Sequence, residues 1–372
     1  MEFGVFINGY LPGQAAHDPA CEHEMLKREL QYVVEADKYN WKYAWVGEHH
    51  SLTEYSHMSA PEVVMGYLAH ATERIHVGTG IMNLSPRVNH PVRSAERVAM
   101  LDHVFEGRFE WGTGRGAGSH EILGFLPDME DLSKTREIWE DVIGEFPKMW
   151  MEDVYEGYEG KYWSLPARRI LPKPYSKPHP PMWYAAGNTS SWEMAGHRGL
   201  GVLGFAIGRM SEFDAVRDAY KQAIATAEPV GAFVNDNIMI CLAAYVDEDG
   251  SRARQQMIAA RPNYLTSNVF RYHDTFPHPK GIPVWPEVIP DLSTEDVERG
   301  IRAGSTIVGD PDEAIAQCQR WVDAGLDQLT FGIGPGSQEE QLETIRLIGT
   351  HVIPKLDTEP LHRTTVQRLA AV

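Results

Sequence analysis

The sequence predicts a (β/α)8 barrel, the TIM-barrel fold, with insertions at its C-terminal mouth. Eight short apolar runs alternate along the chain with longer segments of helical periodicity, and a repeated strand–helix unit is typical of this barrel. Most of the runs are continuously apolar, as expected for parallel strands that are buried on both faces. The length of 372 residues suits one large closed α/β domain, although it also allows two domains.

An open, doubly wound sheet is the alternative architecture. Such a sheet usually has fewer strands, and its phosphate-binding loop follows the first strand. Here the first apolar run, FGVFIN from Phe3, is followed by NGYLPGQ, which is not a loop of that kind. The sequence therefore favours the closed barrel. Its expected strands begin at Phe3, Tyr43, Ile75, Arg108, Pro181, Val202, Ile238 and Asp327.

Amphipathic helices are expected between the strands. The clearest start is at Asp310, which can cap a helix whose first turn holds Pro311 and Glu313. Gly325 is expected to end that helix. The other segments with a helical pattern are residues 22–40, 92–104, 135–151 and 191–198.

We expect a single barrel domain over residues 1–355, with insertions at about 152–180 and 251–305. The first insertion reads as a small hairpin followed by a proline-rich surface strap. The second follows the seventh strand and is too long for one strand–helix loop, so we expect a lid at the mouth with a short helix over residues 294–303. Residues 356–372 are expected to form a polar, peripheral tail.

The composition indicates an acidic, ordered, cytoplasmic protein. Hydrophobic residues make up 43% of the chain and charged residues 23%, which excludes wholesale disorder. A formal net charge of −18 opposes non-specific binding to nucleic acid. We see no membrane span and no signal peptide. The three cysteines are far apart and form no CxxC motif, so neither a disulfide framework nor a Cys-rich zinc site is expected.

Titratable side chains cluster where the second expected strand ends. Glu48, His49 and His50 are consecutive, and barrel active sites lie at the C-terminal ends of the strands. The strand period of two sends Glu48 and His50 to one side and His49 to the other. We interpret the motif as an active-site acid, base or proton donor. The alternative is a histidine that only caps a backbone carbonyl. No histidine spacing matches a metal-binding motif, so no metal is expected.

Two further strand ends are suited to binding an anion. The loop from Gly112 to Gly118 is rich in glycine and carries Arg115, whose planar fork can bind phosphate oxygens. The segment Gly187-Asn188-Thr189-Ser190-Ser191 leads into a helix N-terminus with hydroxyl caps. A tight turn and simple helix capping are the structural alternatives. Together the segments favour a phosphorylated cofactor or substrate. Candidates for an apolar, aromatic mouth are Phe3, Phe6, Trp45, Trp183 and Phe205.

These motifs resemble those of the bacterial luciferase-like family of flavin-dependent monooxygenases. The matching stretches run from about residue 1 to 355: FGVF, VGEHH, VGTG, NHPVRSAERVAMLDHVFEGRFEWGTGRG, AAGNTSSWEMAGHRGLG and IVGDPDEAIAQCQRWVDAGLDQLTF. The longest of them, from His90 to Gly116, is specific. The resemblance implies a (β/α)8 barrel, reduced FMN delivered by a separate flavin reductase, and molecular oxygen as cosubstrate.

The resemblance also implies roles for individual residues. His49 matches the family's active-site histidine, and Phe6 matches an aromatic residue of the pocket. The cofactor-binding positions that it implies are Thr79, Gly80, Arg115, Gly116, Ala117, Gly187, Asn188 and Ser191, to which we add Ser190 of the same helix start.

The sequence also departs from the luciferases proper. Gly114 stands where they have a reactive cysteine, and Gly187 stands where some of them have a carboxylate near the phosphate. Light emission from long-chain aldehydes is therefore not expected.

We hypothesise a two-component FMN-dependent monooxygenase that acts, through a flavin hydroperoxide, on a small or medium hydrophobic substrate such as a ketone, aldehyde or terpene. His49 would position or protonate the peroxide, supported by Glu48 and by Asn83 in the substrate pocket. The alternatives are a deazaflavin-dependent dehydrogenase or reductase on the same barrel and a non-catalytic flavin-binding protein. The apolar helix faces permit a homo-oligomer, which is common in this family.

Overall fold

The computed structural model describes residues 1–11, 13–116, 118–205, 210–259 and 293–371. In this part of the chain, parallel strands close into a barrel whose last strand pairs with the first. Their order is β1 (Glu2–Ile7), β2 (Tyr43–Val46), β3 (His76–Thr79), β5 (Phe109–Gly114), β8 (Met182–Ala185), β9 (Gly201–Phe205), β10 (Ile238–Val246) and β12 (Gln328–Ile333). All eight expected strands, and with them the (β/α)8 fold, are therefore confirmed.

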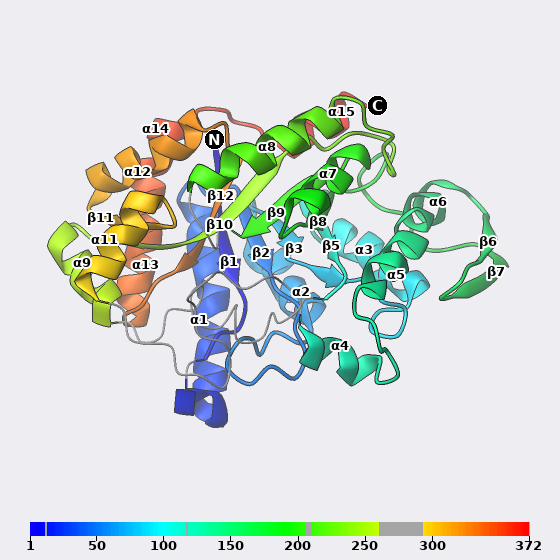
Figure 1. Cartoon of the computed structure of the whole chain (residues 1–372), viewed down its shortest axis with the longest axis horizontal. Coiled ribbons are helices and arrows are strands. Elements are labelled where there is room, and N and C mark those ends of the chain that lie inside the picture. Colours follow the sequence, from blue (N-terminus) through cyan, green and yellow to red (C-terminus); the bar gives the residue numbers. More distant parts are fainter. Residues whose placement is uncertain (12, 117, 206–209, 260–292, 372) are drawn as a thin grey trace.

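Helices surround the strands (Figure 1). At Asp310 the expected cap is confirmed, because its carboxylate accepts the N–H of Glu313 at 2.9 Å, and Gly325 follows the helix with a φ of 79°. The larger helices are α1 (Pro19–Lys38), α2 (Pro61–Ala71), α3 (Pro91–Val104), α7 (Thr189–His197), α8 (Met210–Ile224), α9 (Gly250–Ala259), α12 (Pro311–Asp323) and α13 (Gln338–Leu347). Shorter ones are α4 (Ser119–Phe125), α14 (Ile353–Leu356) and α15 (Arg363–Leu369).

The expected helix over residues 135–151 is wrong as a single element. The chain forms α5 (Lys134–Ile143) and α6 (Glu145–Met151), separated at Gly144. Pro147 explains the break, because a proline inside a continuous helix lacks an N–H donor and clashes with the carbonyl four residues earlier. In α6 the same proline lies in the first turn, where no donor is needed.

The first insertion contains the expected hairpin, formed by the antiparallel strands β6 (Tyr155–Glu159) and β7 (Ser164–Arg168), which projects from the side of the barrel (Figure 1). In the second insertion, α11 (Thr294–Ala303) matches the expected short helix, while residues 260–292 of the expected lid lie outside the described residues. Strands β4 (Met82–Asn83) and β11 (Thr306–Gly309) pair with β5 and β10. No helix in the described ranges is long and apolar enough to cross a membrane.

Two indole side chains fill the middle of the barrel. Trp45 and Trp183 cross at 79°, with 5.2 Å between their ring centroids. Glycines on the neighbouring strands make room for them: a Cβ at Gly78 would lie 2.4 Å from the ring of Trp45, and one at Gly201 would lie 2.5 Å from the ring of Trp183. Side-chain substitution at either glycine would therefore displace an indole.

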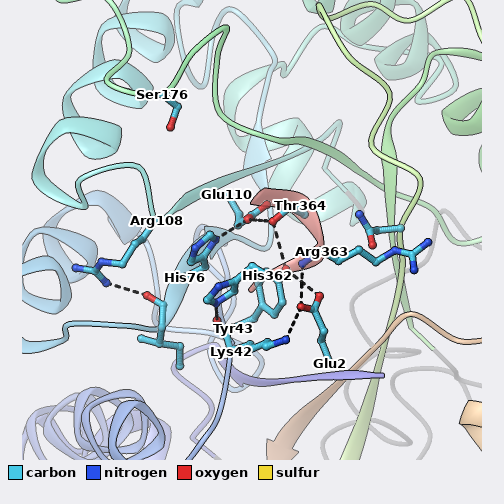
Figure 2. A network of polar contacts seen from close by, with 12 residues as sticks. Glu2, Lys42, Tyr43, His76, Arg108, Glu110, Ser176, His362, Arg363 and Thr364 are labelled. Atoms are coloured by element: carbon cyan, nitrogen blue, oxygen red, sulfur yellow. Dashed lines mark hydrogen bonds and ion pairs between the residues drawn. The ribbon is translucent and has the colours of Figure 1, made fainter. Parts of the chain in front are cut away.

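The expectation of a peripheral tail is wrong, because residues 357–369 close the floor of the barrel. Figure 2 shows Thr364 of α15 beside Glu110, to whose carboxylate it donates a hydrogen bond of 2.6 Å. Lys42 forms ion pairs with Glu2 at 3.0 Å and with Asp357 at 3.1 Å. The tail pairs with polar groups at the buried ends of the strands. Without hydrogen-bond partners at the floor, those groups would lower the free energy of unfolding.

Glu110 joins this floor to the barrel interior. Its carboxylate accepts a hydrogen bond of 2.8 Å from the indole N–H of Trp183 and lies 2.8 Å from Nδ1 of His76. The ring of His76 stacks on that of His362 from the tail, with centroids 3.5 Å apart. Burial raises the pKa of Glu110 to about 8 and lowers that of His76 to about 3.

These pKa shifts predict a pH-dependent effect of Glu110→Gln. Unfolded Glu110 loses its proton near pH 4.5, whereas the folded carboxyl keeps it up to about pH 8. The stabilising contribution of Glu110 is therefore lost as the pH rises through this window. We expect the difference in unfolding free energy, wild type minus Glu110→Gln, to fall between pH 4.5 and 8 by on the order of a few kcal/mol.

Urea unfolding across this pH range measures that difference. Glu359→Gln, which removes an exposed carboxylate from the same tail, should give a difference that does not change with pH. A wild-type-minus-Glu110→Gln difference that is constant, or that grows with pH, would contradict the assignment.

Candidate active site

A hollow opens at the C-terminal ends of β2, β5 and β8, the end of the barrel at which a TIM-barrel active site is expected. It holds about 560 Å³ of space, including the part that opens to solvent. The residues that line it are Glu48, His49, Ile81, Asn83, Gly114, Arg115, Gly116, Glu121, Tyr184, Ala185, Gly187, Asn188 and Ser191. The structure thus brings together most of the residues that the sequence analysis selected.

The other selected residues that the structure describes are not among the residues that line the hollow. Phe6 is 8% exposed and packs with Ile81 in the layer below it. The Thr79 hydroxyl is buried and bonds to the backbone of Gly112. Gly80 directly precedes Ile81, and the peptide between them is cis. Ser190 is exposed on α7, and Ala117 lies outside the described residues.

The expectation that Phe3, Trp45 and Trp183 form an aromatic mouth is wrong. Phe3 is fully buried in the main hydrophobic core. Trp45 and Trp183 lie inside the barrel. Along each strand, residues that point into the barrel alternate with residues that face the surrounding helices. The side chain of Phe205 is outside the described part of the structure.

Arg115 supplies a positive charge at one side of the hollow. Its guanidinium donates a hydrogen bond of 2.7 Å to the hydroxyl of Thr135, on α5. Burial raises the pKa of the neighbouring Tyr184, and the charge of Arg115 opposes that rise. Directly after the arginine, the backbone adopts a left-handed conformation. Gly116 has a φ of 79°, which favours glycine because it has no Cβ.

The N-terminus of α7 meets the same part of the hollow. Asn188 caps this helix by accepting the N–H of Ser191 at 3.0 Å, while the Ser191 hydroxyl accepts the N–H of Asn188 at 3.1 Å. Helix capping, the structural alternative, is thus present. Capping does not use all of the first N–H groups of the helix, and Gly187, Asn188 and Ser191 line the hollow, so the positive end of the helix dipole lies beside it.

The strand-period prediction for Glu48, His49 and His50 is wrong, because β2 ends at Val46 and Glu48 and His49 line the same hollow, whereas His50 is not among the lining residues. The ring of His50 lies 3.3 Å from the Glu48 carboxylate, and this hydrogen bond raises the pKa of His50. The Nδ1 of His49 lies 3.3 Å from the Glu121 carboxylate. Glu121 also accepts the backbone N–H of His50 at 2.8 Å. Two carboxylates therefore hold two adjacent imidazoles in different surroundings.

Sequence reasoning missed Glu121 and Asn89. Glu121 lies in the first turn of α4, six residues after Arg115, and an acidic residue at a helix start usually indicates only favourable helix electrostatics. Asn89 donates hydrogen bonds to the Glu48 carboxylate at 2.7 Å and to the carbonyl of Asn83 at 2.9 Å. Neither pairing could be found without the tertiary structure. In the described ranges, no three His, Cys, Asp or Glu side chains are grouped as metal ligands would be.

Comparison with known proteins identifies the family of the chain. A family model described as "Luciferase-like monooxygenase" matches residues 1–328. The alkanal monooxygenase alpha chain of a Kryptophanaron alfredi symbiont is 26% identical over 372 residues, covering 96% of this chain and 98% of that protein. An F420-dependent glucose-6-phosphate dehydrogenase from Amycolatopsis mediterranei is 25% identical, covering 88% of this chain and 93% of that protein.

Solved structures share the barrel. Monooxygenase RslO1 from Streptomyces bottropensis has a TM-score of 0.77 at 22% identity, covering 95% of this chain and 99% of its own. The oxygenating constituent of 3,6-diketocamphane monooxygenase from Pseudomonas putida, solved with FMN, has a TM-score of 0.75 at 17% identity, covering 96% and 99%. These likenesses show the fold, and the family model extends over most of the sequence. The chain therefore belongs to the luciferase-like monooxygenase family.

Proposed function

We propose that this protein is the oxygenase of a two-component system, which uses reduced FMN and molecular oxygen to oxygenate a small or medium hydrophobic substrate. One observation carries the proposal: Arg115 and the N-terminus of α7 line the same hollow as Glu48 and His49. An anion-binding end and a proton-exchanging end in one site suit a phosphorylated redox cofactor beside its substrate.

The residues present fit a flavin nucleotide. Between the two ends, the wall consists of backbone and small or apolar residues, among them Ile81, Gly114 and Ala185. A Cβ at Gly114 would lie 2.7 Å from the side chain of Ile81, so this glycine keeps the wall open for a planar ring. Arg115, Gly116, Asn188 and Ser191 would hold the phosphate, with Ser190 and Ala117 nearby in sequence.

Reduced FMN, when bound, would supply the electrons that activate oxygen. The chain's own residues bind, orient and exchange protons. Glu121 lies 3.3 Å from the ring of His49 and fixes its orientation at the edge of the hollow. His49 would hold or release the proton that the reaction requires, while Glu48 and Asn83 bind polar groups of the substrate.

Names of relatives support a carbonyl or terpene-like substrate. They include an alkanal monooxygenase and a diketocamphane monooxygenase. Gly114 in place of a reactive cysteine argues against a luminescent reaction with long-chain aldehydes. The "oxygenating constituent" named for one of them supports a separate flavin reductase as partner. Exposed apolar side chains on α2 and α3, Val63, Tyr67 and Met100, support a homo-oligomer, which sedimentation velocity would detect.

Hydride transfer with a deazaflavin is the second candidate function, because a relative is named as an F420-dependent dehydrogenase. Oxygen uptake distinguishes the two. Mixed anaerobically with one equivalent of reduced FMN and then with oxygenated buffer, the protein should consume oxygen and form an oxygenated product from a ketone, aldehyde or terpene panel. Reduced F420 should give no oxygenated product. Substrate reduction by reduced F420, with no product from reduced FMN, would overturn the proposal.

Arg115→Ala tests the phosphate end. Losing a charged hydrogen-bond donor should weaken FMN binding by about 1.5–3 kcal/mol, or roughly 10- to 150-fold in Kd. Fluorescence titration with FMN and with riboflavin measures the effect, and riboflavin, which lacks the phosphate, should be insensitive. Arg136→Ala removes an equal charge from α5, where Arg136 pairs with Glu140, and should leave the Kd within about 2-fold. An unchanged Kd in Arg115→Ala would contradict its role as a phosphate ligand.

His49→Ala and Glu121→Ala test the proton-exchanging end. Loss of the imidazole should lower product formation by about 100-fold or more while FMN affinity stays within a factor of about 2. Glu121→Ala should lower kcat at an unchanged FMN affinity, because the ring of His49 loses its anchoring carboxylate, whereas Glu121→Asp should restore part of the activity. An unchanged kcat in both alanine variants would exclude this assignment.

A further inference from the structure

One oxygen of Glu48 stands out among the polar atoms of the hollow. The side chain is 5% exposed and lines the hollow. Its Oε2 is buried and has no hydrogen-bond partner among the described residues. Buried polar atoms are nearly always paired, so an unpaired carboxylate oxygen at a binding site indicates a partner that arrives with a ligand.

The other oxygen is firmly held. Oε1 accepts a hydrogen bond of 2.7 Å from the amide of Asn89 and lies 3.3 Å from Nε2 of His50. The amide of Asn89 is fixed in turn, since its oxygen accepts a hydrogen bond of 2.8 Å from Arg97. These contacts prevent the carboxylate from turning Oε2 towards a protein donor. The acceptor is thus preorganised at the edge of the hollow.

We propose that Glu48 is a specificity residue that accepts a hydrogen bond from an O–H or N–H group of the substrate. The proposal rests on the proposed oxygenase function and narrows its substrate class. Among the carbonyl and terpene-like compounds proposed above, the substrate is then one that also carries a hydroxyl or an N–H group, such as a hydroxyketone, a terpene alcohol or a lactam, and not one whose only polar groups are carbonyls. A carbonyl oxygen opposite Oε2 would leave two acceptors facing each other without a hydrogen.

Matched pairs of probe compounds test the proposal without turnover. In each pair, a methyl group replaces the donor hydrogen: phenol and anisole, indole and N-methylindole, δ-valerolactam and N-methyl-δ-valerolactam. Calorimetric Kd values are measured for each compound with the FMN-bound protein and with the protein alone. In the wild type we expect the donor to bind at least about 10-fold more tightly than its methylated partner in at least one pair.

Glu48→Gln should reduce that ratio to below about 3-fold. Its single amide oxygen would accept the hydrogen bond from Asn89, so the amide nitrogen, a donor, would take the place of Oε2. Glu96→Gln removes a carboxylate that pairs with Arg93 on the outside of α3 and should leave the ratio unchanged. Should Glu48→Gln fail to fold, as judged by its thermal unfolding, Glu48→Asp is the second variant. It retains the charge, but its shorter side chain moves the carboxylate oxygen away from the substrate, so the ratio should also fall.

Three outcomes would overturn the proposal: no pair discriminated by the wild type, a ratio preserved in Glu48→Gln, or a loss of FMN affinity in that variant at an unchanged ratio. The last result would assign the donor to the flavin. Failure of the proposed function is a separate result, because absence of oxygen uptake with reduced FMN would leave the ratios measured on the protein alone unaffected.

Discussion

The packing of Trp183 inside the barrel connects both ends of the molecule. A closed eight-strand barrel must fill its interior with side chains, and here two crossed indoles and the glycines that accommodate them do so. The indole N–H of Trp183 needs an acceptor in that interior, and Glu110 provides it. Burying Glu110 in turn requires hydrogen-bond partners at the floor: Thr364 donates to its carboxyl group, and Nδ1 of His76 lies 2.8 Å from the same group. The next residues of β8, Tyr184 and Ala185, line the hollow. The packing of Trp183 inside the barrel therefore also positions part of the wall of the hollow.

Charge imposes a second constraint on the site. With a formal net charge of −18, the protein's long-range field would repel an anionic cofactor such as the FMN proposed above, so the capture of that cofactor would depend on short-range contacts. Arg115 and the helix dipole of α7 act at that range, and Thr135 keeps the guanidinium in place. An acidic protein can therefore hold a phosphate without attracting polyanions such as nucleic acids.

Sequence patterns predicted those parts of the structure that depend on interactions between residues close together in the sequence. Continuous apolar runs identified the strands, and the Asp310 cap identified a helix start to the residue. The strand period did not place His49 correctly, because the motif follows the end of β2 and His49 lines the same hollow as Glu48. Pairings between distant segments were not predictable: the burial of Thr364 depends on a carboxylate more than 250 residues away, and the position of Glu121 depends on how α4 packs against the end of β2. From its sequence alone, a polar tail is expected to be peripheral, because the buried groups with which it forms hydrogen bonds lie far away in the sequence.

The two carboxylates beside the histidines show how environment assigns different roles to the same functional group. Glu121 uses both oxygens on protein groups, one on the ring of His49 and one on the backbone of His50. Glu48 uses a single oxygen on Asn89 and His50 and leaves the other without a protein partner among the described residues. A fully paired carboxylate rigidifies what it touches, whereas a half-paired one retains the capacity to recognise a ligand. In the proposed mechanism, the orientation of His49 and the selection of the substrate would therefore be carried out by two different carboxylates beside the same pair of histidines.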